Sequence, residues 1–329
     1  MMTDLPVALL SATAVVLAIR AFRTWAWPDL AWCSLAVGLA LAAKHSAPIF
    51  FLFVNALGAA LIVFTPRSSP SNSRARKLAT LCAVSVGAWL ILFASYSFRF
   101  HESSSAEEVF NRTLAQKIDD LSSPAYHFAL SELAATHLLP RAYLWGFADT
   151  VHVGLEGRAF QQLAFGHVYY HKAPWYFFPG AIAAKLPLGL TLLALSGVFL
   201  LLRKHCPHEW NLPATIVIAA MLCFLVVLAA GATYAGVRHA LPAVVFLAIL
   251  GGMAIATAFH SQRMALKSFV LAALLAALAS ALPVVRPWEY FNELAGGPRN
   301  AYLYFDDEGV DLGQRTKEFA RYYQQAVQP

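Results

Sequence analysis

Charged residues at a few positions in an otherwise apolar chain have the chemistry needed to bind phosphate. Lys44, followed by His45, interrupts a long apolar stretch, and the pair Arg238-His239 stands at the start of another. Lysine offers a compact positive charge, and arginine a fork of donors that matches phosphate oxygens. Lys185 lies just inside an apolar segment in the same way. These five are candidate substrate-binding residues, although snorkelling lysines and interfacial arginines explain the same pattern.

Asp4 is the carboxylate nearest to the start of the first apolar segment. A carboxylate there could accept a proton from a hydroxyl group or hold a divalent cation. Capping of the first helix explains the residue equally well. Asp4 is therefore the candidate catalytic residue, and a divalent cation stays open as a cofactor.

A polar segment, Tyr290-Phe-Asn-Glu-Leu-Ala-Gly-Gly-Pro298, follows the last apolar run. Its Gly-Gly-Pro turn allows positive φ angles and then fixes the chain direction. Aromatic, amide and carboxylate groups together suit a polar ligand at a membrane surface. Tyr290, Asn292 and Glu293 are therefore candidate binding residues, and a capped, solvated tail is the plain alternative.

Other motifs carry little weight. The chain has no Walker loop, dinucleotide fingerprint, HExxH sequence or nucleophile elbow, so any energy for a reaction must arrive with the substrate. His205-Cys206-Pro207-His208 lacks the usual spacing of a structural zinc site, and four scattered cysteines imply no disulfide framework. The net charge of +6 comes with no basic stripe on a soluble face, which argues against nucleic acid as a partner.

The elements that position these residues are membrane-type helices. A hydrophobic content of 59% and a mean hydropathy of +0.58 exclude an ordinary soluble globule. We predict an all-α, polytopic transmembrane bundle with about eight spans, at roughly 20 residues per crossing. The predicted spans are 5–19, the two halves of 30–64 on either side of Lys44, 78–98, 180–202, 212–231, 238–259 and 267–285.

The predicted membrane domain covers residues 1–285 and is followed by a short tail, 286–329. Within it, residues 99–176 form one long polar loop, because their charges cannot lie in the bilayer core. We expect a short amphipathic surface helix at 107–121 and aromatic segments along the interface at 138–147 and 168–178.

Basic residues in the short loops predict the orientation. The loops that contain Arg20, Arg67–Lys77, Arg203 and Arg263 fall on the same side in an alternating count, and the positive-inside rule makes that side cytoplasmic. The candidate residues, the long loop and the tail then lie together on the outer face.

Six segments, in their order and spacing, resemble a known family. They are Thr3-Asp-Leu-Pro6, Gly38-Leu-Ala-Leu-Ala-Ala-Lys44, Trp175-Tyr-Phe-Phe-Pro179 with Lys185-Leu-Pro-Leu-Gly189, Arg238-His-Ala-Leu-Pro242, Tyr290-Phe-Asn-Glu-Leu-Ala-Gly-Gly-Pro298, and Asp306 to Gln314. Over essentially its whole length the chain resembles the membrane glycosyltransferases of the GT-C class. Within that class it resembles the bacterial family 39 proteins related to protein O-mannosyltransferases and aminoarabinose transferases.

The resemblance implies transfer of a sugar from a polyprenyl-phosphate donor, with inversion at the anomeric carbon. The acceptor would be a lipid, protein or polysaccharide on the outer side of the bacterial inner membrane. It also implies that Lys44 and Arg238 hold the lipid phosphate and that Asp4 matches the second acidic residue of the family site. A phosphate leaving group reduces the chemistry to positioning, charge neutralisation and one base.

The sequence departs from the family at both ends. The family's first helices and outer loop, with the acidic residue usually taken as the base, have no counterpart before Thr3, and Leu312 stands where a tryptophan is usual. We therefore expect a form that lacks its N-terminal part and is not fully active alone. The alternative is a non-catalytic membrane protein that binds polyprenyl phosphate, either a transporter or a partner subunit. A transporter is less favoured, because no internal repeat is visible.

Overall fold

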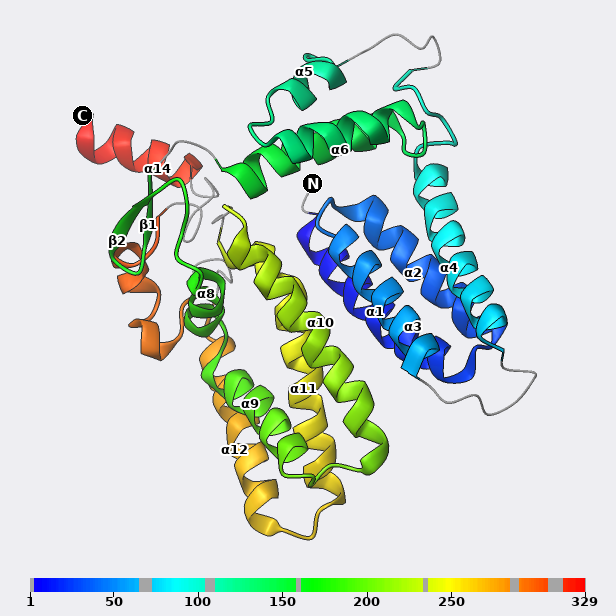
Figure 1. The fold of residues 1–329 in the computed structure, drawn as a ribbon. Coiled ribbons are helices and arrows are strands. Elements are labelled where there is room, and N and C mark those ends of the chain that lie inside the picture. The colour runs from blue at the N-terminus through cyan, green and yellow to red at the C-terminus, as the bar shows by residue number, and fades with distance from the viewer. Residues whose placement is uncertain are drawn as a thin grey trace. The chain divides into compact units, whose positions relative to one another are not determined.

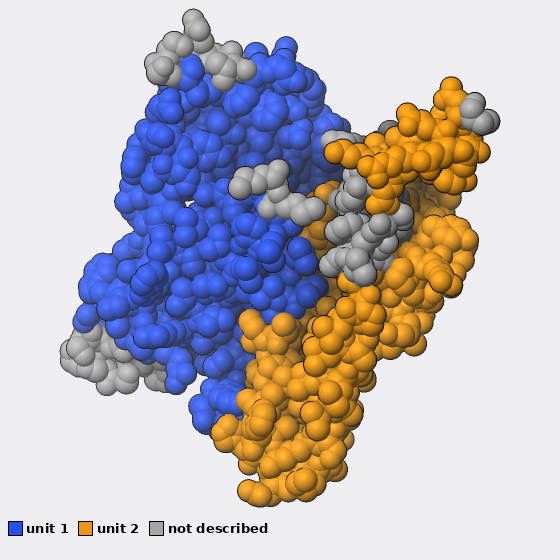
Figure 2. All heavy atoms as spheres, turned by 180° about the vertical axis from the view of Figure 1, so that it is seen from behind, with its two compact units in different colours: residues 1–158, 206–233, 241–246 blue, residues 159–205, 234–240, 247–329 orange. Residues whose placement is uncertain are grey.

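The computed structural model describes residues 3–64, 73–103, 110–157, 161–232, 236–284, 290–306 and 316–328 (Figure 1). The chain forms two compact units, distinguished by colour in Figure 2. Unit 1 comprises residues 1–158, 206–233 and 241–246, and unit 2 comprises residues 159–205, 234–240 and 247–329. The polypeptide therefore passes between the units several times.

Unit 1 is built from helices. Figure 1 shows α1 to α4 running antiparallel, with α6 crosswise to them. The elements are α1 (Asp4–Thr24), α2 (Trp27–Ala43), α3 (Pro48–Phe64), α4 (Arg74–Ser95), α5 (Leu114–Asp119), α6 (Pro124–Ala135), α7 (Arg141–Val151), the π-helical turn η2 (His152–Glu156), the 3-10 turn η3 (His208–Trp210), α10 (Asn211–Ala230) and the first residues of α11 (Leu241–His260).

Small residues let α1 and α2 pack closely. The buried faces are rich in alanine, including Ala14 and Ala18 of α1 and Ala36 and Ala40 of α2. Small side chains allow helix backbones to approach each other and maximise van der Waals contact. At the turn between the helices Trp25 takes a left-handed conformation (φ 50°), and its N–H bonds to the carbonyl of Ala21. This packing holds the start of α1 and the end of α2 at the same end of the helix pair.

Helices α5, α6 and α7 form a second layer in unit 1 around an apolar cluster that includes Ile118, Leu130 and Leu144. Helix α5 starts with a capping box in which Thr113 and Gln116 bond to each other's backbone N–H groups. The indole of Trp89 in α4 donates a 2.6 Å hydrogen bond to the carbonyl of Leu138, which ties this layer to the helices below it.

Unit 2 combines helices with one antiparallel hairpin, in which Gln161 pairs with Tyr170. Its elements are β1 (Gln161–Ala164), β2 (His167–Tyr170), α8 (Phe177–Lys185), α9 (Leu188–Leu202), the 3-10 turn η4 (Val237–Ala240), the remainder of α11, α12 (Met264–Ala281), the 3-10 turns η6 (Glu293–Ala295) and η7 (Pro298–Leu303), α14 (Thr316–Tyr322) and the π-helical turn η8 (Tyr323–Val327).

Helix α9 packs against its neighbours through glycines. A Cβ atom at Gly189 would lie 2.0 Å from the carbonyl oxygen of Ala273, and one at Gly197 would lie 2.0 Å from that of Leu250. No flexible side chain can move away to relieve either contact. Only glycine permits these backbone approaches.

Replacing Gly197 by alanine is expected to destabilise the protein by about 1–3 kcal/mol, the usual cost of overpacking. The matched control is Gly252→Ala in α11, where an added Cβ meets nothing within 4 Å. That control should be neutral or stabilising by up to about 1 kcal/mol, because alanine favours the helix. Thermal unfolding of the two variants in detergent measures the difference, and equal midpoints would contradict the close approach of α9.

The expected all-α class is confirmed in its main feature, with the short hairpin as an addition. Five of the described helical segments are long and apolar enough to cross a membrane, so the chain is compatible with an integral membrane protein. They contain α1, α4, α10, α11 and α12, whereas α2, α3 and α9 are apolar but shorter. The number of eight spans therefore stays a prediction.

Several expected boundaries were wrong. The predicted span 180–202 is interrupted, because α8 ends at Lys185 and α9 begins after Pro187. Proline restricts the residue before it to extended conformations, which ends the helix. Of the expected surface helix at 107–121, residues 107–109 lie outside the described residues, and helix is present over Leu114–Asp119. The segment 168–178 includes part of a strand, and its place along the interface stays a prediction. In the predicted tail, residues 286–289 and 307–315, including Leu312, lie outside the described residues.

Candidate functional site

In unit 1 the structure brings Asp4 and Lys44 together. Asp4 opens α1, and Lys44 follows α2 in an extended conformation (φ −163°, ψ 146°). The ammonium group donates a short hydrogen bond to the Asp4 carboxylate, so the two form an ion pair. The side chain of Lys44 is only 23% exposed and that of Asp4 only 13%. A half-buried pair interacts more strongly than one at a solvated surface, because water screens it less.

His45, beside Lys44, is held by α7. Its ring lies 4.8 Å from the ring of Tyr143 between centroids, and a Cβ atom at Gly146 would approach its Cε1 atom to 2.5 Å. Burial lowers the pKa of His45, and a hydrogen bond to the Tyr143 backbone offsets part of that effect. The imidazole is therefore neutral at pH 7. One ring nitrogen is engaged with the Tyr143 backbone, and the other is left as a hydrogen-bond acceptor.

Sequence reasoning missed Tyr143. This residue is 3% exposed, and its hydroxyl group has no hydrogen-bond partner among the described residues. Burial raises its pKa, with a smaller contribution from Tyr96. The one signal in the sequence was the aromatic run at 138–147, which indicated an interface segment and gave no sign of a contact with His45.

In unit 2 Lys185 ends α8 and lies against the polar segment at 290–298. Its ammonium group stands 4.3 Å from the ring centroid of Phe291. Burial lowers the pKa of Lys185 to about 8. Next to it, a cavity of about 10 Å³ is lined by both residues and by Gly236 and Val237. That volume suits one water molecule.

Arg238 and His239 belong to η4, which packs against α8. Both side chains are half-buried. The structure therefore places the elements that carry Lys185 and Arg238 in contact within unit 2.

Asn292 connects α8 to the polar segment and is completely buried. Its Nδ2 group donates to the carbonyls of Ala183 (2.5 Å) and Leu186 (2.9 Å), and its Oδ1 accepts from the N–H of Ala295 (3.1 Å). Its backbone N–H bonds to Ala184 at 2.9 Å. The last carbonyls of a helix have no hydrogen-bond donors within that helix. Asn292 supplies these donors at the end of α8. Asn292 therefore holds the end of α8 against the polar segment, and we call these hydrogen bonds the Asn292 clasp.

Tyr290 and Glu293 both contact Ser280, at the end of α12. The Ser280 hydroxyl lies 2.5 Å from the Tyr290 hydroxyl and 2.6 Å from Glu293 Oε1. The bond from Ser280 lowers the pKa of the exposed Glu293 carboxyl, whereas burial raises the pKa of Tyr290. Ser280 was not singled out in the sequence. The polar segment at 290–298 is thus hydrogen-bonded to the ends of two helices, α8 through Asn292 and α12 through Ser280.

A metal centre receives no support from the described part of the chain, where no three His, Cys, Asp or Glu side chains group together. Cys206 is buried, and His205 instead contacts Arg263 at 3.2 Å. A divalent cation at Asp4 would therefore need further ligands from its substrate.

Comparison with protein-family models, with curated proteins and with solved structures finds no match to this chain.

The pH dependence of Lys185 provides a test of its burial. Because its pKa is about 8, below the ordinary value of 10.5, its charge disfavours the fold below pH 8, and this cost is relieved as the pH rises towards 10.5. Acylation of Lys185, followed by peptide mass spectrometry, should reach half its maximal rate near pH 8. The exposed Lys204 serves as the internal control, and its acylation profile should differ from that of Lys185. Superimposable profiles would contradict the buried position.

Proposed function

We propose that this chain binds a polyprenyl-phosphate-linked sugar and transfers the sugar to a hydroxyl group at the outer face of the bacterial inner membrane. The observation that carries the proposal is the half-buried pair of Asp4 and Lys44. A cation and a carboxylate at one end of two apolar helices are the two groups that the reaction needs. The residue pattern of the family it resembles supports the same roles.

The donor phosphate competes with Asp4 for Lys44. When the phosphate accepts the ammonium donors, the carboxylate is released and can accept a proton. The acceptor hydroxyl oxygen attacks the anomeric carbon on the face opposite to the phosphate, and the carbon–oxygen bond to phosphate breaks. The phosphate leaves with the bonding electrons, and the hydroxyl proton passes to Asp4. The products are an inverted glycoside and the polyprenyl phosphate.

His45 is a neutral neighbour of the pair, and its remaining ring nitrogen can accept a hydrogen bond from a hydroxyl group without adding charge. Arg238 and Lys185 stay candidate phosphate ligands on their chemistry. The acceptor is a lipid, a protein or a polysaccharide, each of which offers hydroxyl groups. Membrane lipids surround the apolar helices in every case.

Binding of undecaprenyl phosphate to the full chain in nanodiscs, followed by native mass spectrometry, tests the first half of the proposal. Lys44→Gln should weaken binding about tenfold to a hundredfold, because a charge-assisted hydrogen bond is lost. Lys44→Arg keeps the charge and should retain most of the affinity. This comparison distinguishes the loss of a contact with the phosphate from a general loss of folding. Lys204→Gln, at an exposed lysine, is the control. Equal binding by Lys44→Gln and the control would refute the assignment.

A second candidate function is favoured by the same contact. A carboxylate that already holds an ammonium group is a weak proton acceptor, and this suits a protein that binds polyprenyl phosphate without transferring a sugar. Such a protein would act as a partner subunit or a transporter. It would retain the donor in the nanodisc experiment and release no glycoside.

A further inference from the structure

A cavity of about 310 Å³ lies within unit 1, between α5, α6 and the chain before α5. This volume is at the lower end of the range for small-molecule sites, so the cavity holds one ring-sized group and not an extended chain. Its walls combine apolar side chains such as Leu114 and Ile118 with a set of polar groups. None of the residues discussed in the proposed reaction lines it.

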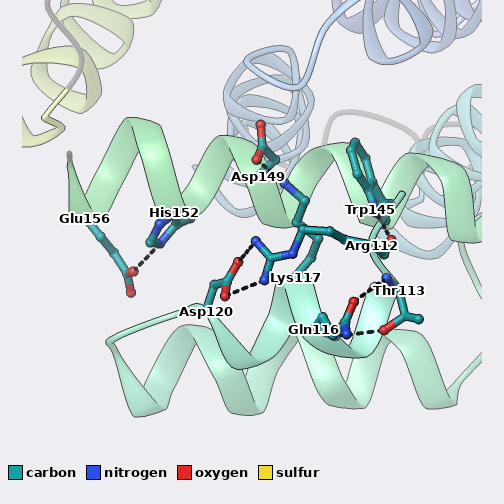
Figure 3. Close-up of polar contacts among 9 residues, drawn as sticks. All are labelled: Arg112, Thr113, Gln116, Lys117, Asp120, Trp145, Asp149, His152 and Glu156. Atoms are coloured by element: carbon teal, nitrogen blue, oxygen red, sulfur yellow. Dashed lines mark hydrogen bonds and ion pairs between the residues drawn. The ribbon is translucent and has the colours of Figure 1, made fainter. Parts of the chain in front are cut away.

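Ion pairs fix the wall formed by α5 (Figure 3). Arg112 bonds to Asp120 through both terminal nitrogens, at 2.6 and 2.7 Å. Lys117 bonds to Asp149 of α7 at 2.5 Å and stands 4.5 Å above the ring of Trp145. The Arg112 contact lowers the pKa of the Asp120 carboxyl, so its ion pair persists down to acidic pH. A short helix held in this way keeps its position without a ligand.

The wall formed by α6 is fixed at its first turn. Glu156 accepts hydrogen bonds from the N–H groups of Ser122 (2.9 Å) and Ser123 (2.8 Å), and His152 lies 3.3 Å from it. Burial alone would raise the pKa of Glu156, but these hydrogen bonds outweigh it and lower the pKa. The carboxylate therefore remains charged at neutral pH and anchors the start of α6. Both walls are preformed, which reduces the entropic cost of binding.

Three rings stand together at one side of the cavity. The ring of Phe100 lies 4.1 Å from that of His137, at an interplanar angle of 33°, and 5.0 Å from that of His101, at 78°. Neither histidine side chain makes a hydrogen bond to another described residue, although both make these ring contacts. The rings offer a flat apolar surface whose edges carry imidazole donors and acceptors.

The polar residues that line the cavity include Asp119, Ser131 and Arg141. Arg141 donates from Nε to the buried carboxylate of Glu102 at 3.1 Å, so its charge is balanced. Asp119 is 73% exposed at its side chain; its Oδ1 lies 3.3 Å from Nε2 of His127, and its Oδ2 can accept a hydrogen bond from a ligand. Because Arg141 is paired with a buried carboxylate and a second carboxylate, Asp119, lines the cavity, the cavity disfavours a phosphate group. Its chemistry suits a neutral ring with one apolar face and several hydroxyl groups.

We infer that this cavity is a carbohydrate site that takes a single hexose-sized ring. The C–H face of the sugar packs on the rings of Phe100 and His137, and its hydroxyl groups donate to Asp119 and exchange hydrogen bonds with Ser131. The site does not depend on transfer or on polyprenyl phosphate. It gives the protein a second point of contact with a glycan, distinct from the Asp4–Lys44 pair.

Saturation-transfer NMR with methyl hexopyranosides tests the inference on the full chain in nanodiscs, which avoids detergents with sugar headgroups. His137→Asn removes the ring at a position with φ 56°, a conformation that asparagine tolerates. His171→Asn, at an exposed position with φ 62° in unit 2, is the matched control. Asp119→Asn removes the carboxylate charge without changing its size.

The wild type and His171→Asn should show saturation transfer to at least one hexoside. His137→Asn should weaken that binding about threefold to tenfold, and Asp119→Asn should weaken it about tenfold or more. Absence of transfer to every hexoside would overturn the inference. So would equal effects of the two His→Asn substitutions, or saturation of a nucleoside while the sugars stay unaffected.

Discussion

Replacing Asp4 by asparagine is expected to lower the rate of sugar transfer by about a hundredfold to ten-thousandfold, the usual contribution of a general base. The same change should leave donor binding intact or strengthen it, because the phosphate no longer has to displace a carboxylate from Lys44. Release of labelled glycoside from a polyprenyl-phosphate sugar measures the first effect. Native mass spectrometry of the bound donor measures the second. The opposite directions of the two effects distinguish a base from a residue that only supports folding.

Asp29 provides a control for Asp4. It also lies in the first turn of a helix and pairs with a cation, Arg20, at 2.7 Å. Its predicted location is the cytoplasmic side, away from the reaction. Asp29→Asn should therefore leave transfer within about twofold of the wild type once protein amounts are matched, a change of less than about 0.5 kcal/mol in the barrier. Transfer that survives Asp4→Asn would remove Asp4 from the proposed mechanism.

The second large effect is expected at Asn292. Asn292→Leu removes both donors to the carbonyls at the end of α8 and the acceptor for Ala295. Each buried group left without a partner costs about 1–3 kcal/mol, so a loss of roughly 3 kcal/mol in the free energy of unfolding is expected. Thermal unfolding and hydrogen exchange at residues 183–186 measure it. The carbonyls that Asn292 holds flank Lys185, so the acylation profile of that lysine should also move towards that of an exposed lysine.

Asn300 is the matched control for the clasp. It lies in η7, directly after the polar segment, is exposed, and makes one side-chain bond to the carbonyl of Gly296, at 3.1 Å. Asn300→Leu should change stability by no more than about 0.5 kcal/mol, as surface substitutions usually do. If both leucine variants unfold at the same temperature, the buried hydrogen bonds of Asn292 do not have the strength assigned to them.

The helical class could be predicted from the sequence because the apolar runs are long and continuous. Helices α1, α4, α10, α11 and α12 occupy runs that hydropathy alone identifies. The break at Lys185 could not be placed in this way, since alanine, leucine and glycine on either side are all apolar. Hydropathy measures transfer into lipid, whereas Pro187 acts through backbone sterics. The hairpin was missed because its strands are four residues each, too short for a period of two to stand out.

The candidate site was predicted in residue type better than in role. Asp4 and Lys44 were separately noted, and only the packing of α1 on α2 brings their side chains together. Asn292 was predicted to bind a ligand, yet in the fold its donors and its acceptor are all engaged within the chain. The residue type limits which hydrogen bonds a side chain can form, but long-range packing decides which partner group it meets. Tyr143 escaped notice because its partner His45 lies far from it in the sequence. Ser280 escaped notice because it stands within an apolar run, and only the fold of the chain after α12 brings Tyr290 and Glu293 to it.

Photo-crosslinking with a diazirine-bearing polyprenyl-phosphate sugar, followed by peptide mapping, tests the central claim most directly. We expect crosslinks at the start of α1 and at residues 44–47 in the wild type. Lys44→Gln should reduce them about tenfold or more, and Lys204→Gln should leave them unchanged. Crosslinks of equal yield in Lys44→Gln, or crosslinks confined to other parts of the chain, would contradict a donor site at the Asp4–Lys44 pair.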